Sequence, residues 1–171
     1  YSFDGAETIT FKNMTLRSGG NKDYLGFIRI NNTIVENCVI NGKTAYWGYL
    51  TATFRNTTFN CPEEDYALWT YSSPEMTFDR CTFNSSGKVI NVYTENGNND
   101  ITVNFNGCTV NNSGSSLKPV LNINDCLREN KKFFIYISGD NVVKGVDVDK
   151  DTCSRLFGFG GKAITNNKGK T

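Results

Sequence analysis

The charged residues that could carry out proton transfer recur at one position of a short repeated phrase. They are Lys12, Glu36, Arg55 and Asp79, one in each of four successive copies, and Arg80 follows Asp79 directly. General acid–base catalysis needs two or three titratable groups that converge on one face of a protein. Here the charges alternate in sign, so that neighbouring copies neutralise each other. The pattern therefore favours a column of ion pairs that fixes strand register over an active site.

Three aspartates at alternate positions, Asp147, Asp149 and Asp151, match the start of a calcium-binding loop. The rest of that loop is missing, because no glycine stands at its sixth position and Gly158 replaces the glutamate at its twelfth. The chain also has no histidine, and its six cysteines form no CxxC pair, so the usual zinc spacings are absent. We therefore expect a surface loop at these aspartates, and neither a metal nor a cofactor.

Three of the six cysteines occupy one position of the repeated phrase, three residues after its central apolar residue. They are Cys38, Cys81 and Cys108, and two other copies have Met14 and Thr57 at this position. The pattern favours a column of buried free thiols that act as small hydrophobic groups. A disulfide between Cys81 and Cys108 stays open as an alternative, although parallel Cβ vectors on neighbouring strands fit disulfide geometry poorly.

The repeated phrase is the element that must position all of these residues. Its copies are ITFKNMTL (9–16), TIVENCVI (33–40), ATFRNTTF (52–59), MTFDRCTF (76–83) and VNFNGCTV (103–110), with a looser copy, IYISGDNV, at 135–142. Successive central apolar residues are 24, 19, 24, 27 and 32 residues apart, and this drift indicates stacked repeats that differ in loop length. Within a copy the apolar residues alternate and then skip one position, which predicts a strand that bends at a corner.

The bend is predicted directly after the charged position of each copy. The residue there is Asn or Gly in all copies but one, namely Asn13, Asn37, Asn56, Arg80, Gly107 and Gly139. Asn and Gly tolerate the left-handed backbone of a tight bend, and stacked asparagines can form a hydrogen-bonded ladder. A second, weaker strand is predicted between copies, at 25–30, 47–51, 67–71, 89–93, 120–124 and 155–159.

The phrases TFKNMTL, TFRNTTF and TFDRCTF resemble repeats of the right-handed parallel β-helix, the pectate-lyase-like superfold, and especially Asn-rich repeats of bacterial cell-surface proteins. The resemblance covers about residues 3–165 and implies an all-β fold, a right-handed parallel β-helix (solenoid) of about six coils. We expect residues 1–171 to form one such domain, a fragment of a longer surface protein, because the repeat starts in mid-phase at Tyr1. This fold also carries polysaccharide lyases and hydrolases, and for such an enzyme Glu36, Asp79 and Arg80 would be the catalytic candidates.

Aromatic residues make up 13% of the chain, and several lie on the predicted second strands. Aligning these strands places Phe27, Tyr49 and Trp69 in one outward column and Tyr71 and Tyr93 in the next, with Trp47 near the edge. Exposed Trp and Tyr side chains on a flat sheet would form a platform for a sugar ring or a protein partner. The alternative is that these rings only stack between repeats, or face inward because the register is displaced by one residue.

Composition narrows the classes of function. The formal net charge of +1 gives no electrostatic reason to expect a nucleic-acid partner, and no apolar run is long enough for insertion into a membrane. We therefore predict a non-enzymatic binding or adhesion module with an extracellular location at the bacterial cell surface. Its partners would be a host or bacterial surface protein or glycan, and neighbouring domains of the same chain. It would bind through the aromatic strands and the loops at 18–24, 61–66, 94–100 and 112–118. A polysaccharide-active enzyme and a passive stalk are the alternatives.

Overall fold

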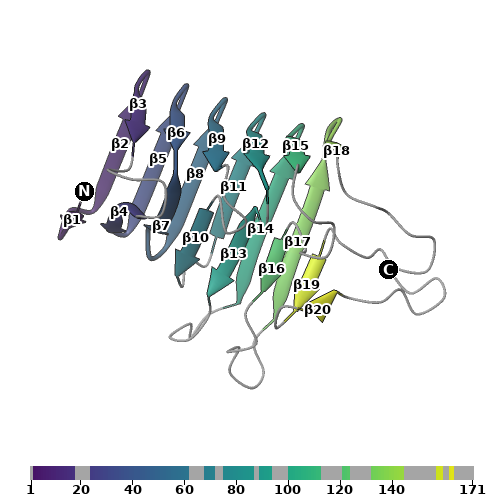
Figure 1. The fold of residues 1–171 in the computed structure, drawn as a ribbon. Helices are drawn as coiled ribbons and strands as arrows, with labels where there is room; N and C mark the ends of the chain where they lie inside the picture. Colours follow the sequence, from purple (N-terminus) through teal and green to yellow (C-terminus); the bar gives the residue numbers. More distant parts are fainter. Residues whose placement is uncertain are drawn as a thin grey trace.

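The computed structural model describes residues 2–17, 24–61, 68–71, 75–86, 89–93, 100–112, 121–123, 132–144, 157–159 and 162–163. In these ranges the chain forms strands and no helix, and thus no helix of the length and apolarity needed to cross a membrane. The strands belong to three sheets, and successive repeats lie side by side along the stack from β1 to β18 (Figure 1).

Every repeat contributes strands to the three sheets in the same order. Sheet A contains β1 (Ser2–Asp4), β4 (Tyr24–Arg29), β7 (Lys43–Trp47), β10 (Leu68–Tyr71), β13 (Ile90–Tyr93), β16 (Leu121–Ile123), β19 (Phe157–Phe159) and β20 (Lys162–Ala163). Sheet B contains β2 (Thr8–Lys12), β5 (Asn32–Glu36), β8 (Thr51–Arg55), β11 (Glu75–Asp79), β14 (Ile101–Asn106) and β17 (Phe133–Ser138). Sheet C contains β3 (Thr15–Arg17), β6 (Val39–Asn41), β9 (Thr58–Cys61), β12 (Thr82–Ser85), β15 (Thr109–Asn112) and β18 (Val142–Lys144).

Neighbouring strands in these sheets are parallel, except for the antiparallel pair β19 and β20. The register of sheet B places the central apolar residues of the repeated phrase in one row, namely Phe11, Val35, Phe54, Phe78, Phe105 and Ile137. The alignment of the copies is therefore confirmed. The described chain is an all-β structure of stacked parallel sheets, which is compatible with a parallel β-helix.

The corner between sheets B and C has the predicted left-handed backbone. The φ angles there lie between 47° and 69°, at Asn13, Asn37, Asn56, Arg80, Gly107 and Gly139. The three asparagines form the expected ladder, because Asn37 Nδ2 donates to Asn13 Oδ1 (3.2 Å) and Asn56 Nδ2 donates to Asn37 Oδ1 (3.3 Å). Arg80 has no short amide with which to compensate for this conformation, so its backbone is strained.

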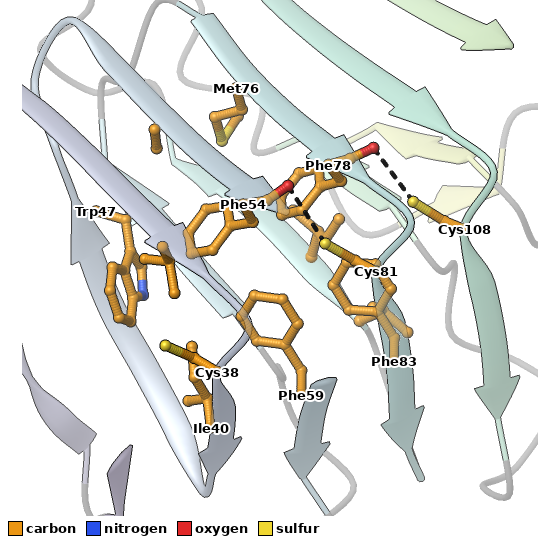
Figure 2. Close-up of a cluster of buried hydrophobic side chains, with 14 of the residues drawn as sticks. Cys38, Ile40, Trp47, Phe54, Phe59, Met76, Phe78, Cys81, Phe83 and Cys108 are labelled. Atoms are coloured by element: carbon orange, nitrogen blue, oxygen red, sulfur yellow. Dashed lines mark hydrogen bonds between the residues drawn. The ribbon is translucent and has the colours of Figure 1, made fainter. Parts of the chain in front are cut away.

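Stacked aromatic rings fill the core between the sheets (Figure 2). Phe54 lies parallel to Phe78, with ring centroids 5.1 Å apart, and Phe78 lies parallel to Phe105 at 5.4 Å. A second stack from sheet C, Phe59 and Phe83 at 4.9 Å, meets the first edge to face. Each fully buried ring contributes about 1.5–3 kcal/mol to folding, so the core makes the stack a stable scaffold.

The prediction of buried free thiols is confirmed for Cys38, Cys81 and Cys108, so the alternative of a Cys81–Cys108 disulfide was wrong. These thiols do more than fill space. In Figure 2, Cys81 Sγ donates to the backbone carbonyl of Phe54 in the preceding repeat (3.4 Å), and Cys108 Sγ donates to that of Phe78 (3.3 Å).

The same column also supplies an acceptor for a backbone donor. In the last repeat the Cys108 N–H donates to Asn141 Oδ1 (2.7 Å). A hydrogen bond with the Cys108 thiol and burial both raise the pKa of Cys81, which therefore stays a neutral donor. From the second repeat to the fifth, the side chain at this position donates to a carbonyl oxygen of the preceding repeat, at Cys38, Thr57, Cys81 and Cys108.

The second strands lie within two residues of their predicted positions in every repeat but one. The strand expected at 47–51 was wrong, because β7 ends at Trp47 and the chain turns before β8. Gly48 causes the difference. Its φ is 90°, and a Cβ atom there would lie 2.4 Å from the carbonyl oxygen of Thr51. Only glycine fits this turn without displacing the backbone.

Candidate functional site

The outward face of sheet B is the most completely described surface that a ligand could reach, and we call it the outer face of sheet B. Strand side chains alternate between core and solvent, so strand register assembles the outward residues into three columns. The first column is Thr8, Asn32, Thr51, Glu75, Thr102 and Phe134. The second column is Thr10, Ile34, Thr53, Thr77, Asn104 and Tyr136. The third column is Lys12, Glu36, Arg55, Asp79, Asn106 and Ser138.

The third column contains the predicted ion-pair ladder. Lys12 Nζ lies 2.8 Å from Glu36 Oε2, and Arg55 Nη1 lies 2.8 Å from Glu36 Oε1. Hydrogen bonds from Lys12 and then from Arg55 lower the pKa of Glu36. Hydrogen bonds from Arg80 (3.0 Å) and from Asn106 (2.8 Å) likewise lower the pKa of Asp79. The ladder that the alternating charges predicted is confirmed for Lys12, Glu36 and Arg55, whereas Asp79 pairs with Arg80 and not with Arg55.

The three catalytic candidates do not converge in this arrangement. Arg55 lies between Glu36 and Asp79 in the register, so two strand spacings, about 10 Å, separate the two carboxylates along the sheet. Arg80 is paired with the neighbouring Asp79. A general acid needs a raised pKa, whereas both carboxylates have lowered pKa values and engaged oxygens. The positions of these charged groups therefore suit a role in fixing strand register more than a role in proton transfer.

Asparagine ladders run along both outward surfaces. On sheet C, Asn60 Nδ2 donates to Asn41 Oδ1 (2.9 Å), Asn84 Nδ2 to Asn60 Oδ1 (2.8 Å) and Asn111 Nδ2 to Asn84 Oδ1 (2.8 Å). On sheet B, Asn104 Nδ2 donates to Thr77 Oγ1 (3.2 Å). In each of these bonds the donor belongs to the later repeat and the acceptor to the earlier one. The ladders thus engage these asparagines in contacts inside the protein.

The expected aromatic platform on sheet A needs correction at Trp47. This side chain is 1% exposed and packs edge-on against Phe54, with ring centroids 5.3 Å apart. The register explains its position, because Trp47 lies opposite the buried Ile28 of β4 and so shares its inward face. Predicting exposure for Trp47 was therefore wrong.

Tyr49 is exposed, with 40% of its surface accessible, but it lies in the turn after β7 and belongs to no column. Ala45 stands in the place predicted for Tyr49, since it is the register partner of both Phe27 and Trp69. Tyr71 and Tyr93 are direct register partners, as expected. The side chains of Phe27, Trp69, Tyr71 and Tyr93 lie outside the described part of the structure, so their role in binding stays a prediction.

The sequence interpretation missed an aromatic pair, Phe134 and Tyr136, in the last repeat of the outer face of sheet B. Phe134 is 38% exposed and Tyr136 56%, and their rings are nearly parallel, with an interplanar angle of 11° and centroids 6.4 Å apart. A signal for them exists in the aligned copies. The second column holds small polar residues or Ile34 in the first five repeats and a tyrosine only in the sixth.

Two further predictions fall outside the described ranges. They concern the calcium-loop candidates Asp147, Asp149 and Asp151, and almost all of the loops at 18–24, 61–66, 94–100 and 112–118. Within the described ranges, no three His, Cys, Asp or Glu side chains gather as metal ligands.

Comparison with known proteins yields no match for this chain, whether with protein-family models, curated proteins or solved structures. The assignment of a function therefore depends on the geometry of the chain itself.

Proposed function

We propose that this chain is a non-catalytic binding module of a bacterial surface protein, built on a right-handed, pectate-lyase-like parallel β-helix of about six coils. The observation that carries the proposal is the exposed pair Phe134 and Tyr136. Exposed aromatic side chains on a rigid surface are favoured at binding sites, because they offer a large contact area and lose little conformational entropy when they are buried. The partner class is a surface protein or glycan outside the cell.

The stacked core supports this proposal. The parallel phenylalanine stacks and the ladders fix the strand register, so the outer face of sheet B is presented in one geometry before a ligand arrives. A preorganised surface loses little entropy on binding. The paired state of Glu36 and Asp79 also favours a role in the scaffold. The strands that carry Phe27, Trp69, Tyr71 and Tyr93 form a second proposed surface.

The test compares binding and turnover in the same preparation. Labelled protein is titrated onto panels of cell-surface proteins and glycans, and cleavage products are sought with polygalacturonate and host glycans. We expect saturable binding that is lost in the Phe134→Thr/Tyr136→Thr variant and no turnover. Turnover that is lost in Asp79→Asn would overturn the proposal in favour of an enzyme, and the absence of binding to every probe would favour a passive stalk.

Threonine is the appropriate replacement because both columns already accept it. Thr8, Thr51 and Thr102 stand in the column of Phe134, and Thr10, Thr53 and Thr77 stand in that of Tyr136. Each change makes the last repeat resemble the others, so the variant should fold. Trp69→Ala tests the second surface separately.

A further inference from the structure

We propose that two copies of this chain associate end to end, through the edges of β17 and β18. Both strands are the last of their sheets in the described part of the chain (Figure 1), whereas at the same end of sheet A the antiparallel strand β20 lies beyond β19. The edge strand of a sheet presents backbone N–H and C=O groups that can pair with a strand of another chain. Such pairing does not depend on the binding function proposed above.

The apolar side chains at this end of the stack are unusually exposed. Of the eight large apolar side chains that are exposed in the described ranges, five belong to β17 and β18, namely Phe134, Tyr136, Ile137, Val142 and Val143. Ile137 continues the inward row of Phe105, but it is 57% exposed where Phe105 is 9% exposed. Val143 continues the inward row of Val110, and it is 38% exposed where Val110 is 5% exposed. The core is thus uncovered at this end, as in a protein–protein interface without its partner.

A second copy could cover this end as one more repeat, in a head-to-tail stack, but charge opposes that arrangement. One outward row of sheet C begins with Arg17 and ends with Lys144. A head-to-tail stack would therefore place Arg17 of one copy beside Lys144 of the other, and like charges on neighbouring strands repel. At the first end of the stack, Phe11 and Leu16 are already buried, so this arrangement would also cover less apolar surface.

A two-fold arrangement avoids the contact between these cations. A two-fold axis through the corner between β17 and β18 makes β17 of each copy antiparallel to β18 of the other. Asp140 lies in this corner, three residues after Ile137 and three before Val143. Pairing about Asp140 thus sets Ile137 of one copy opposite Val143 of the other. Both are inward residues, and directly opposite residues of an antiparallel pair share a face, so the two uncovered rows would bury each other.

The outward residues of this register fit with one exception. Tyr136 lies opposite Lys144 of the second copy, where an ammonium group can contact the aromatic ring. Ser138 likewise lies opposite Val142. The exception is Asp140, because the axis brings the Asp140 side chains of the two copies together, and these like charges oppose association. We therefore expect a dimer that dissociates on dilution and becomes tighter when Asp140 is neutralised.

The dimer would affect how the chain binds a surface. Sheet B of each copy would continue into sheet C of the other, so the outer face of sheet B would stay open and would occur twice in one particle. Two linked sites hold a surface that carries many copies of a ligand more tightly than one site does.

Sedimentation of the whole chain over a series of concentrations measures the association. We expect a monomer–dimer equilibrium with no larger species. Ile137→Asp, at a residue that is already exposed, should raise the dissociation constant of the dimer by about tenfold or more. Asp140→Asn should lower it by about two- to fivefold. The matched control is Glu75→Gln, which removes the same charge from an exposed residue within sheet B and should leave the dissociation constant unchanged. Circular dichroism checks that each variant keeps its fold.

Cysteine cross-linking tests the register of the two copies. Tyr136→Cys/Lys144→Cys should give a covalent dimer on oxidation, because the two positions lie opposite each other across the axis. Arg17→Cys/Lys144→Cys should give no more cross-linking than the wild type, which is the control for the native cysteines.

Three results would overturn the proposed dimer. The first is a chain that stays monomeric at every concentration; if its Ile137→Asp variant then loses binding to a cell-surface protein, that protein is the occupant of the edge. The second is an association that Ile137→Asp leaves unchanged, which would place the interface elsewhere. The third is cross-linking of Arg17→Cys/Lys144→Cys into species larger than a dimer, which would show a head-to-tail stack. A monomeric chain that still binds surface proteins or glycans would leave the proposed function standing.

Discussion

Replacing Cys81 with threonine or with valine separates the hydrogen bonding of the thiol column from its packing. The two residues have nearly the same shape, and threonine already stands at this position in the preceding repeat. There the buried Thr57 Oγ1 donates to the carbonyl oxygens of Arg55 (3.0 Å) and Val35 (3.5 Å). Valine fills the same volume but neither donates nor accepts.

The expected magnitude follows from the groups that lose a partner. In Cys81→Val, the backbone carbonyl of the buried Phe54 loses the hydrogen bond from the Cys81 thiol. A typical hydrogen bond contributes about 0.5–1.5 kcal/mol, and threonine can restore this one whereas valine cannot, so we expect a loss of about 1 kcal/mol relative to Cys81→Thr. For a chain of this length each kcal/mol shifts Tm by about 2–4 °C, and the valine variant should therefore melt about 2–4 °C below the threonine variant.

Thermal and urea unfolding followed by circular dichroism measure this difference. The matched control is Thr82→Val on the outward face of β12, in a column where Val39 and Val142 stand in other repeats. That change should shift stability by less than about 0.5 kcal/mol, as surface substitutions usually do. If Cys81→Val and Cys81→Thr are equally stable while Thr82→Val is neutral, the column consists of hydrophobic fillers and the reasoning is refuted.

Three other predictions concern the ladder, the corner and the turn. The lowered pKa of Glu36 means that its ionised form stabilises the folded chain at neutral pH, and that this contribution declines as the pH falls below 4.5 through the lowered value. Urea unfolding should show Glu36→Gln less stable than wild type at pH 7, and the difference should shrink as the pH is lowered. Arg80→Asn should stabilise the chain by up to about 1 kcal/mol in the same assay, because asparagine tolerates the left-handed backbone. Gly48→Ala should cost more than about 2 kcal/mol, since its Cβ atom meets the carbonyl of Thr51, whereas Gly5→Ala, with a similar φ and open space, should cost only about 1 kcal/mol.

Each of these has a result that would contradict it. A stability difference for Glu36→Gln that is the same at every pH would mean that the carboxylate acts through its shape and not its charge. A loss of stability in Arg80→Asn would show that the contact with Asp79 outweighs the strain. Equal costs for Gly48→Ala and Gly5→Ala would show that the turn relaxes around the added methyl group.

The strands and corners that recur from repeat to repeat could be predicted from the sequence. Each of them depends on a few residues that are close together in the chain and that recur in successive copies. The alternation around Phe54 and Phe78 marks strands, and an asparagine or glycine marks every corner except that of Arg80, since few other residues tolerate the left-handed backbone. The end of β7 could not be predicted in this way. Trp47 and Tyr49 alternate as strand residues do, and only the close approach of Gly48 to Thr51 shows that the chain turns between them.

The candidate site was harder to predict than the fold because a binding surface depends on which aromatic side chains the fold leaves exposed. Trp47 is a typical binding residue by type, yet a register with Ile28 places it in the core. Tyr136 occurs in the least regular copy of the phrase. Its outward position could be predicted only if that copy was accepted as a repeat. The charge ladder could be predicted because its alternation is visible in the sequence itself.

The common direction of the asparagine ladders determines how a chain of this kind can change in length. On sheet C, Asn60 and Asn84 each donate to the repeat before and accept from the repeat after, so these repeats offer their neighbours the same pair of groups. Duplicating or deleting the repeat of Asn60 or that of Asn84 would therefore join a donor to an acceptor at the new boundary. Gene duplication could lengthen the protein in whole-repeat steps, and only the aromatic residues of a single repeat would need to diverge for a new ligand.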